Sequence, residues 1–276
     1  MSQREILENN NILGIIAGNG KFPIMLAQKA THSGYSLVVA GIKGDTSSLM
    51  RFAPGHFSLF GPGEMRKILD YFKKHGVKKV VMVGQVSPSN LFDKKVKIDE
   101  EFEKIFQSIE NRKADTIFNA IAQKLKENGM ELTDSTFLLN EHLAPKGTLT
   151  KRGPTLSELD DISFGQEIAK QMGEIDVGQT VVVKEKAIVA IEAMEGTNKA
   201  ILRGGVIARS GAVVVKMSKP KQDFRFDVPV VGPQTIKIMA SVKASCLAVE
   251  SQKTLMIDRE QCVRLANRSG ICIVAV

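Results

Sequence analysis

The sequence contains few aromatic residues and few cysteines. It has no Trp, two Tyr and an aromatic fraction of 5%, and no stretch alternates basic with aromatic side chains. Proteins that bind single-stranded nucleic acid stack bases on aromatic rings, so this composition argues against a nucleic-acid partner. The three cysteines, Cys246, Cys262 and Cys272, show no C-x-x-C spacing, which is typical of a protein in a reducing compartment.

Long apolar runs are also missing. No stretch reaches the length of a membrane span, and the first twelve residues carry Arg4, Glu5 and Glu8 without the apolar centre of a secretory signal. We therefore expect a cytoplasmic protein. Its 38 Lys and Arg against 30 Asp and Glu give a formal net charge of +8, which favours acidic partners such as phosphates and anionic lipid head groups.

Several common catalytic motifs do not occur. The four histidines show neither H-x-x-x-H nor H-E-x-x-H spacing, so they do not indicate a zinc site. There is no G-x-S-x-G and no G-x-x-x-x-G-K-[ST], which leaves acyl hydrolases and P-loop NTPases without support.

The first half alternates strand and helix patterns, with strands expected at residues 11–17, 36–40 and 77–83, helices at 22–30 and 65–74, and a helical pattern over 99–129. This order predicts a parallel sheet covered by helices. Gly18 and Gly20 follow the first strand, where they permit a tight turn and let backbone N–H groups approach a phosphate, although a simple turn is the alternative. Pro23 replaces the third glycine of the dinucleotide fingerprint, and no acid ends the second strand, which weakens the case for NAD(P).

A loop rich in Gly, Pro, Thr and Lys, residues 143–157, marks the passage between domains, and a helix is expected over 158–172. Beyond Asp176 the pattern predicts a smaller mixed sheet, with strands at 180–184, 187–190, 212–216, 255–257 and 271–276 and helices at 232–243 and 258–268. We expect an N-terminal domain over 1–145, a linker and connecting helix over 146–175, and a catalytic α/β domain over 176–276.

The most informative stretch lies between 216 and 227, where charged and polar residues gather: Lys216, Lys219, Lys221, Gln222, Asp223, Arg225 and Asp227. Hydrolysis of a diphosphate needs cations near the phosphate oxygens and carboxylates that hold a divalent metal or orient water. Asp223 and Asp227 would share one side of the chain in a helix or in an extended segment. Alternating apolar residues could anchor the segment, and the competing interpretation is a solvated charged loop.

A second polar group flanks the strands at 180–184 and 187–190. Asp176 and Gln179 precede the first of them, and Glu195, Gly196 and Thr197 follow the second. Thr197 or Asn198 could cap the next helix, whose N–H groups would suit a phosphate.

Four motifs carry a resemblance to a known family. LGIIAGNGKFP, RGPTLSELDDISFG, DVGQTVVVKEKAIVAIEAMEGTNKAILRGG and KMSKPKQDFRFDVPVVGPQTI, in this order and over nearly the whole chain, resemble the UDP-2,3-diacylglucosamine pyrophosphatases of the LpxI type. The resemblance implies hydrolysis of UDP-2,3-diacylglucosamine to UMP and 2,3-diacylglucosamine 1-phosphate (lipid X) in lipid A biosynthesis, with attack at the sugar-side phosphorus. It also implies Mg²⁺, with Mn²⁺ as an alternative, and a Rossmann-like N-terminal domain with the lipid held in a cleft between the domains.

The resemblance points to Asp227, then Asp223, as the essential aspartate, and both are expected to bind the metal. Lys219 and Arg225 are the expected catalytic cations. The remaining predicted substrate-binding residues are Gly18, Gly20, Asp176, Gln179, Glu195, Gly196, Thr197 and Gln222. Asn198 stands where the family usually has Asp, so it is not assigned to the metal.

The expected partners are the diacylated nucleotide sugar and, peripherally, the anionic cytoplasmic face of the inner membrane, with a homodimer as the expected assembly. Two other functions compete, a non-catalytic protein that binds a nucleotide sugar or lipid and an NAD(P)-linked oxidoreductase.

Overall fold

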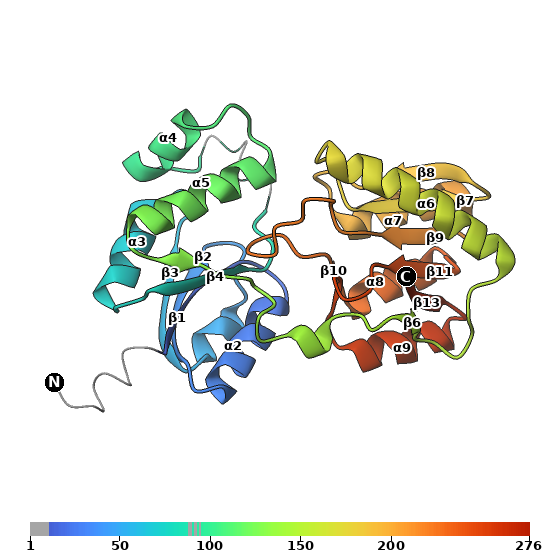
Figure 1. Cartoon of the computed structure of the whole chain (residues 1–276), viewed down its shortest axis with the longest axis horizontal. Helices are drawn as coiled ribbons and strands as arrows, with labels where there is room; N and C mark the ends of the chain where they lie inside the picture. The colour runs from blue at the N-terminus through green and yellow to red at the C-terminus, as the bar shows by residue number, and fades with distance from the viewer. Residues whose placement is uncertain (1–10, 88–89, 91–92, 94) are drawn as a thin grey trace. The chain divides into compact units, whose positions relative to one another are not determined.

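The computed structural model describes residues 11–87, 90, 93 and 95–276. The chain forms two compact units (Figure 1). Unit 1 holds the described residues up to Leu139 together with Phe224–Asp227, and unit 2 holds Asn140–Asp223 and Val228–Val276. Residues 146–175, expected as a linker and connecting helix, therefore lie in unit 2. Arg4, Glu5 and Glu8, used above to assess a signal sequence, lie outside the described residues.

Unit 1 contains a parallel sheet whose strands are ordered β3-β2-β1-β4-β5. The strands are β1 (Ile12–Ala17), β2 (Ser36–Ile42), β3 (Gly55–Phe60), β4 (Lys79–Val83) and β5 (Glu131–Leu132). Ile15 pairs with Val39 on one side and Val81 on the other. These three strands are almost wholly apolar because helices cover the sheet. The chain order reverses between β1 and β4, and ligands of open α/β sheets bind at the carboxyl ends of strands near such a reversal.

The helical segments of unit 1 are α2 (Phe22–His32), η1 (Ser48–Phe52), α3 (Met65–Lys74), α4 (Glu100–Gln107) and α5 (Ala114–Glu127). The predicted helical stretch 99–129 is thus two helices. Asp99 caps α4 by accepting a hydrogen bond from the backbone N–H of Phe102, and Asn111 accepts from the N–H of Lys113 just before α5. These side-chain bonds compete with a continuous helix and separate the two.

Unit 2 contains a mixed sheet with the strand order β6-β13-β11-β9-β7-β8. The strands are β6 (Gly147–Thr148), β7 (Thr180–Lys184), β8 (Ala187–Ile191), β9 (Val213–Lys216), β11 (Cys246–Val249) and β13 (Cys272–Ala275). β9, β11 and β13 run parallel, while β7, β8 and β6 pair antiparallel with their neighbours. A separate pair, β10 (Val230–Val231) and β12 (Leu255–Met256), is parallel.

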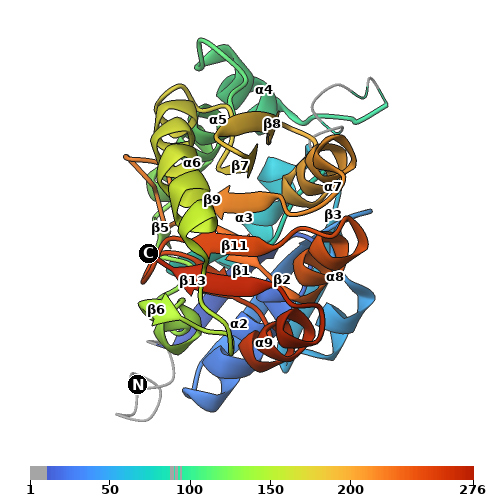
Figure 2. The ribbon, with the colours of Figure 1, turned by 90° about the vertical axis from the view of Figure 1, so that its right-hand side faces the viewer.

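Helices cover both faces of this sheet (Figure 2). α6 (Leu156–Glu174) lies on one face, and α7 (Thr197–Ala208), α8 (Pro233–Ser241) and α9 (Arg259–Arg268) lie on the other. The 3-10 turn η3 (Asn140–His142) begins the unit. A hydrophobic core lies on each face of the sheet, and alternate residues of β9 pack into them. Val213 and Val215 pack on the α6 side, and Val214 packs on the α7 side.

α6 is fixed at its N-terminus by a capping box between Thr155 and Glu158. Arg152 adds two hydrogen bonds to the Glu158 carboxylate, at 2.8 and 2.9 Å. Burial alone would raise the pKa of Glu158, but the bonds from Arg152 and from Thr155 outweigh it and lower the pKa to about 2. The start of α6 is therefore held by an ion pair between the buried Glu158 and the half-buried Arg152.

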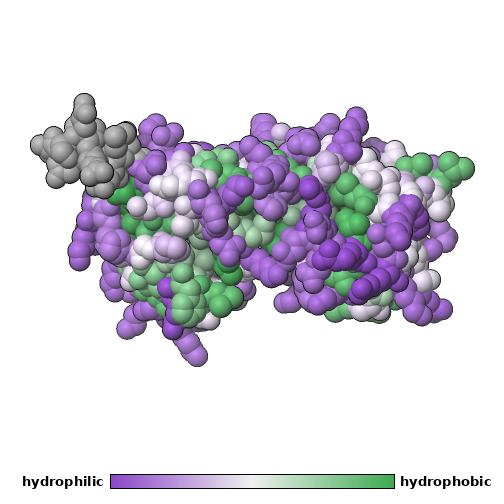
Figure 3. Space-filling view, turned by 90° about the horizontal axis from the view of Figure 1, so that it is seen from below, coloured by the Kyte–Doolittle hydropathy of each residue, from purple (hydrophilic) through white to green (hydrophobic). Residues whose placement is uncertain are grey.

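In the view of Figure 3, hydrophilic side chains cover much of the visible face, and hydrophobic residues show between them. None of the helices formed by the described residues combines the length and the apolar character needed to cross a bilayer.

Candidate functional site

One edge of the unit 2 sheet gathers buried and half-buried polar side chains. β8, β9 and β11 end there. Lys216 is the last residue of β9, while Glu192 and Glu250 follow β8 and β11. β7 begins at the same edge with Thr180, which pairs with Lys216 across the sheet. β9 and β11 are parallel, so their carboxyl ends meet at this edge, where ligands of α/β sheets commonly bind.

Lys216 lies at the centre of this edge and is 5% exposed. Its Nζ donates to Thr197 Oγ1 at 2.8 Å and to Thr180 Oγ1 at 3.2 Å, and it lies 3.6 Å from Glu192 Oε2. The Thr197 hydroxyl in turn donates to Glu192 Oε1 at 2.8 Å. Lys216, Glu192, Thr180 and Thr197 form what we call the Lys216 cluster, a buried ion pair that ties the start of α7 to the ends of β8 and β9.

The start of α7 differs from the prediction for Thr197 and Asn198. The N-cap is Gly196, at φ 83°, and no side chain caps the helix. The capping prediction is wrong because the two side chains have other partners: Thr197 bonds to Glu192, and Asn198 Oδ1 accepts from Thr235 Oγ1. The first turn of α7 thus keeps its backbone N–H groups without a side-chain cap.

Glu195 is half-buried beside this turn. Its carboxylate accepts hydrogen bonds from Arg203 at 2.7 Å and from the backbone N–H of Ala193 at 3.0 Å. The bond from Arg203 is the main reason that the pKa of Glu195 lies below its ordinary value. The carboxylate therefore links the loop between β8 and α7 to Arg203 of α7.

The chain that leaves β9 brings together four of the predicted residues. Lys219, 8% exposed, places its Nζ 2.6 Å from Asp176 Oδ1, and its backbone N–H donates to Gln222 Oε1 at 2.7 Å. Gln179 joins through its backbone, whose carbonyl accepts from the N–H of Met217 at 3.0 Å. The cation at 219 is therefore held in place by an acid that the sequence interpretation assigned to substrate binding.

Glu250 fixes the same segment from the end of β11. Its Oε2 accepts from the backbone N–H of Ser218 at 2.9 Å and also from the Ser218 hydroxyl. Burial would raise the pKa of Glu250, but hydrogen bonds from Lys253 and Ser218 lower it below its ordinary value.

The next four residues, Phe224–Asp227, belong to unit 1. The carbonyl of Phe224 accepts from the backbone N–H and the hydroxyl of Ser135, at 3.0 and 2.8 Å. Phe226 packs on Phe118, with ring centroids 5.3 Å apart, and joins the core of that unit. The expectation that alternating apolar residues anchor this segment is met by Phe226.

Arg225 and the two aspartates sit on this crossing segment. Arg225 donates to Asn119 Oδ1 at 3.2 Å. Residues 224–226 form a turn, so the prediction that Asp223 and Asp227 share one side of a helix or strand is wrong. Asp223 belongs to unit 2 and Asp227 to unit 1, and both side chains are half-buried.

Gly18 and Gly20 occupy the turn between β1 and α2 in unit 1. The amide of Gly18 donates to the Val83 carbonyl at 2.8 Å, and the amide of Asn19 donates to the Gln85 carbonyl at 2.7 Å. Gly20 donates to its neighbour's side chain, Asn19 Oδ1, at 2.6 Å. A Cβ on Gly18 would lie 2.6 Å from the Gln85 carbonyl oxygen. This close approach of the backbone is sufficient to explain why residue 18 is a glycine.

Thr180, Glu192 and Lys216 are not among the site residues predicted from the sequence, although Lys216 is part of the charged run. The available signal was a lysine that ends an apolar strand, because a buried lysine needs a partner. Within the part of the chain that the structure describes, no three His, Cys, Asp or Glu side chains come close enough to hold a metal ion. The three cysteines are buried and form no disulfide.

Comparison with known families covers both units. The family model of the LpxI N-terminal domain matches residues 12–142, and that of the LpxI C-terminal domain matches residues 145–274. The chain is also similar to the UDP-2,3-diacylglucosamine pyrophosphatase LpxI of Caulobacter vibrioides, with 28% identity over 276 residues, covering 96% of this chain and 97% of that protein. Two domain matches in the expected order over nearly every residue confirm the resemblance seen in the motifs, and the chain belongs to the LpxI family.

Proposed function

We propose that this protein hydrolyses the pyrophosphate bond of UDP-2,3-diacylglucosamine, releasing UMP and 2,3-diacylglucosamine 1-phosphate for lipid A biosynthesis. The name of the Caulobacter relative, which is similar over the full length of both chains, supports the substrate. The observation that carries the proposal in the structure is the end of β9 and the loop that follows it. Within twelve residues it holds two lysines fixed by carboxylates, Lys216 and Lys219, and then Asp223, Arg225 and Asp227.

In this proposal, water attacks one phosphorus atom of the diphosphate, the bond from that phosphorus to the bridging oxygen breaks, and the other phosphate leaves with the bridging oxygen. Lys219 and Arg225 neutralise charge that develops on the phosphoryl oxygens. Asp227 orients the attacking water, with Asp223 beside it in the sequence. Because Phe226 is packed in the core of unit 1, the residue that follows it is held by a rigid neighbour.

The proposal includes Mg²⁺, for which the protein would supply only part of the ligands. Asp227 and Asp223 offer the oxygen ligands that Mg²⁺ prefers, and Mg²⁺ commonly binds one or two carboxylates together with substrate phosphates. Asp227 and Asp223 would hold the ion together with oxygens of the diphosphate, and the ion would draw charge from the phosphoryl group. Mn²⁺ would suit the same ligands.

Unit 1 would take up the nucleotide as a Rossmann-like domain, consistent with its strand order, and the substrate would lie in a cleft to which both units contribute. The amides of Gly18 and Asn19 donate to backbone carbonyls, so the first turn of α2 would supply donors, together with the Gly20 amide once it leaves Asn19 Oδ1. In unit 2 we assign the uncapped turn at Gly196 and Thr197, with Gln179, Gln222, Asp176 and Glu195, to the positioning of substrate. We further propose a cytoplasmic enzyme that is peripheral on the inner membrane.

The test is hydrolysis of UDP-2,3-diacylglucosamine by the purified protein in ¹⁸O-labelled water, followed by ³¹P NMR. We expect UMP to be released with Mg²⁺ and not with EDTA, and ¹⁸O to appear in the sugar 1-phosphate if the sugar-side phosphorus is attacked. Label in UMP would reverse that assignment. Asp227→Ala should abolish release but retain substrate binding.

Tight binding of the nucleotide sugar by the wild-type protein without release of UMP would overturn the enzymatic proposal and favour a binding protein. A change in nicotinamide absorbance on mixing with NADH and candidate substrates would favour an oxidoreductase instead.

A further inference from the structure

The outer side of α7 presents apolar side chains to solvent. Leu202, Val206 and Ile207 are 49%, 69% and 60% exposed, and with Lys199 and Arg203 they form the whole exposed side of the helix. The spacing 199, 202, 203, 206, 207 is that of one helical face. The opposite side is already buried, with Gly204 against Val182 and Gly205 against Val242 of unit 2, so the exposed apolar residues are surplus to the core.

All charged residues in the two stretches that contain α7 and α8 are basic. No Asp or Glu occurs in residues 196–222 or in residues 228–249, the two stretches that contain α7 and α8. Lys199 and Arg203 lie on the helix itself, and Arg203 also bonds to Glu195. Lys237 is an exposed residue of α8.

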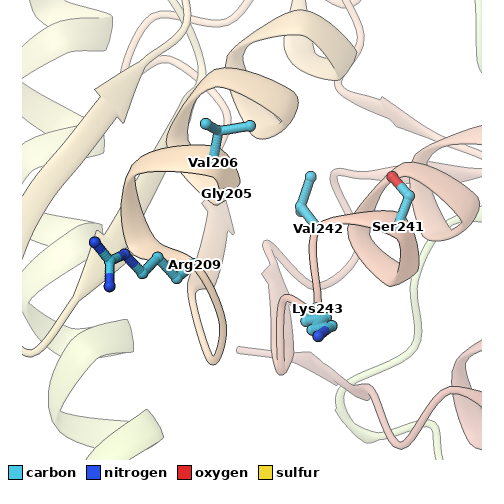
Figure 4. A pocket seen from close by; sticks show the side chains of 6 residues that line it. All are labelled: Gly205, Val206, Arg209, Ser241, Val242 and Lys243. Atoms are coloured by element: carbon cyan, nitrogen blue, oxygen red, sulfur yellow. The ribbon is translucent and has the colours of Figure 1, made fainter.

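A shallow pocket of about 200 Å³ continues the apolar side (Figure 4). It is lined by Gly205, Val206, Arg209, Ser241, Val242 and Lys243, where α7 and α8 end. Val206 belongs to both the exposed face and the pocket, and Arg209 and Lys243 supply two cations at its border.

We propose that this surface, which we call the α7 face (Lys199, Leu202, Arg203, Val206, Ile207, Arg209 and Lys243), docks on an anionic phospholipid bilayer. Apolar side chains flanked by cations are the pattern of helices that lie in a membrane interface. A second copy of the chain is a poorer occupant, because a symmetric contact would bring the same cations against one another. The inference deepens the proposed function by naming the surface that would meet the bilayer holding a diacylated substrate.

The test is flotation of the full-length protein with vesicles of phosphatidylcholine alone and of phosphatidylcholine mixed with phosphatidylglycerol. We expect binding to the anionic vesicles, weakened by added salt. Val206→Glu with Ile207→Glu should reduce the partition coefficient about tenfold or more, because it removes apolar contact and adds like charge. Leu156→Glu is the matched control, since Leu156 is an 84% exposed apolar residue of α6 and should bind as wild type.

Arg209→Asn with Lys243→Asn is the second variant. Both residues have positive φ, at 63° and 54°, a conformation that Asn tolerates, so folding should be preserved. Each removed cation is expected to weaken binding to anionic vesicles about fivefold. This variant keeps the proposal testable if the Glu variant unfolds.

Equal binding of the Glu variant and wild type, or no binding of wild type to anionic vesicles, would overturn the proposal. So would a stable wild-type dimer that the Glu variant splits, because the face would then be an interface between copies. Vesicle binding requires no turnover, and UMP release from detergent-dispersed substrate should be unchanged in all three variants. Failure of the enzymatic proposal would therefore show in the wild-type UMP assay and not in flotation.

Discussion

Two turns in this molecule follow a buried strand at its carboxyl end and use their polar groups differently. The Gly18–Gly20 turn after β1 bonds its first two amides to the backbone carbonyls of Val83 and Gln85. The end of β9 and the segment after it instead bury charged side chains, Lys216 beside Glu192 and Lys219 beside Asp176. The comparison teaches that the carboxyl end of a strand is a place where a ligand can bind. The hydrogen bonds that its polar groups already make within the protein determine which groups remain for that ligand.

The largest expected effect tests the charged segment of unit 2. Lys216→Met keeps the length of the side chain but leaves Glu192 buried without its cation, which should cost about 3 to 5 kcal/mol in the free energy of unfolding. Urea denaturation measures the loss. Adding Glu192→Gln should restore part of the stability, because the remaining amide carries no charge. If the double variant is no more stable than Lys216→Met, the ion pair does not account for the loss.

The second prediction concerns acid. The lowered pKa of Glu158, about 2, means that its stabilisation of unit 2 is complete above the unfolded value near 4.5 and is lost as the pH falls from about 4.5 to about 2. Glu64 and Glu101 of unit 1 also have lowered pKa values from bonds to lysines, but their carboxylates lie near the surface, where such pairs stabilise little. Hydrogen exchange at falling pH should therefore expose β9 and β11 before β1. Earlier exposure of β1 would contradict this order.

The third prediction tests whether Gly18 is needed for backbone packing or for a ligand. Gly18→Ala would place a Cβ 2.6 Å from the Gln85 carbonyl oxygen, so we expect a loss of about 2 kcal/mol in stability. Gly20→Ala is the control: its Cβ meets nothing within 4 Å, but φ is +94°, and about 1 kcal/mol of strain is expected. Thermal unfolding measures both. A large rise in KM for Gly18→Ala with unchanged stability would show that this residue contacts substrate directly.

The smallest effect is expected for Asn19→Ala, which releases the Gly20 amide from Asn19 Oδ1. Loss of one exposed hydrogen bond should change stability by about 0.5 kcal/mol. If the Gly20 amide donates to a substrate phosphate, KM for the nucleotide sugar should stay the same or fall slightly. A KM several-fold higher would assign the Asn19 side chain, and not the Gly20 amide, to binding.

Local pattern was sufficient for many of the regular elements. The helix over Met65–Lys74 and the strand over Thr180–Lys184 match their predicted bounds, since each has a clear apolar period and clear ends. β3 and β11 were not predicted. β3 is an edge strand with exposed His56, and β11 is only four residues, Cys246–Val249, so neither shows a period long enough to recognise.

The candidate site could be predicted from the sequence only in part, for a different reason. The run from Lys216 to Asp227 is contiguous, and its charges could be recognised without a structure. The partners of those charges, Glu192 for Lys216 and Asp176 for Lys219, are distant in sequence and come close only through sheet pairing. The roles given to the site residues and to Mg²⁺ stay predictions.

The sequence by itself determined the alternation of strands and helices, the family, and the segment in which charge is concentrated, because these depend on neighbouring residues and on motif order. Only the tertiary structure decided that Phe224–Asp227 packs with unit 1 while Asp223 stays with unit 2, and that the amide of Gly18 is already bonded. The physical reason is that burial and hydrogen-bond partners arise between residues far apart in the chain, and no local period records which of them will meet.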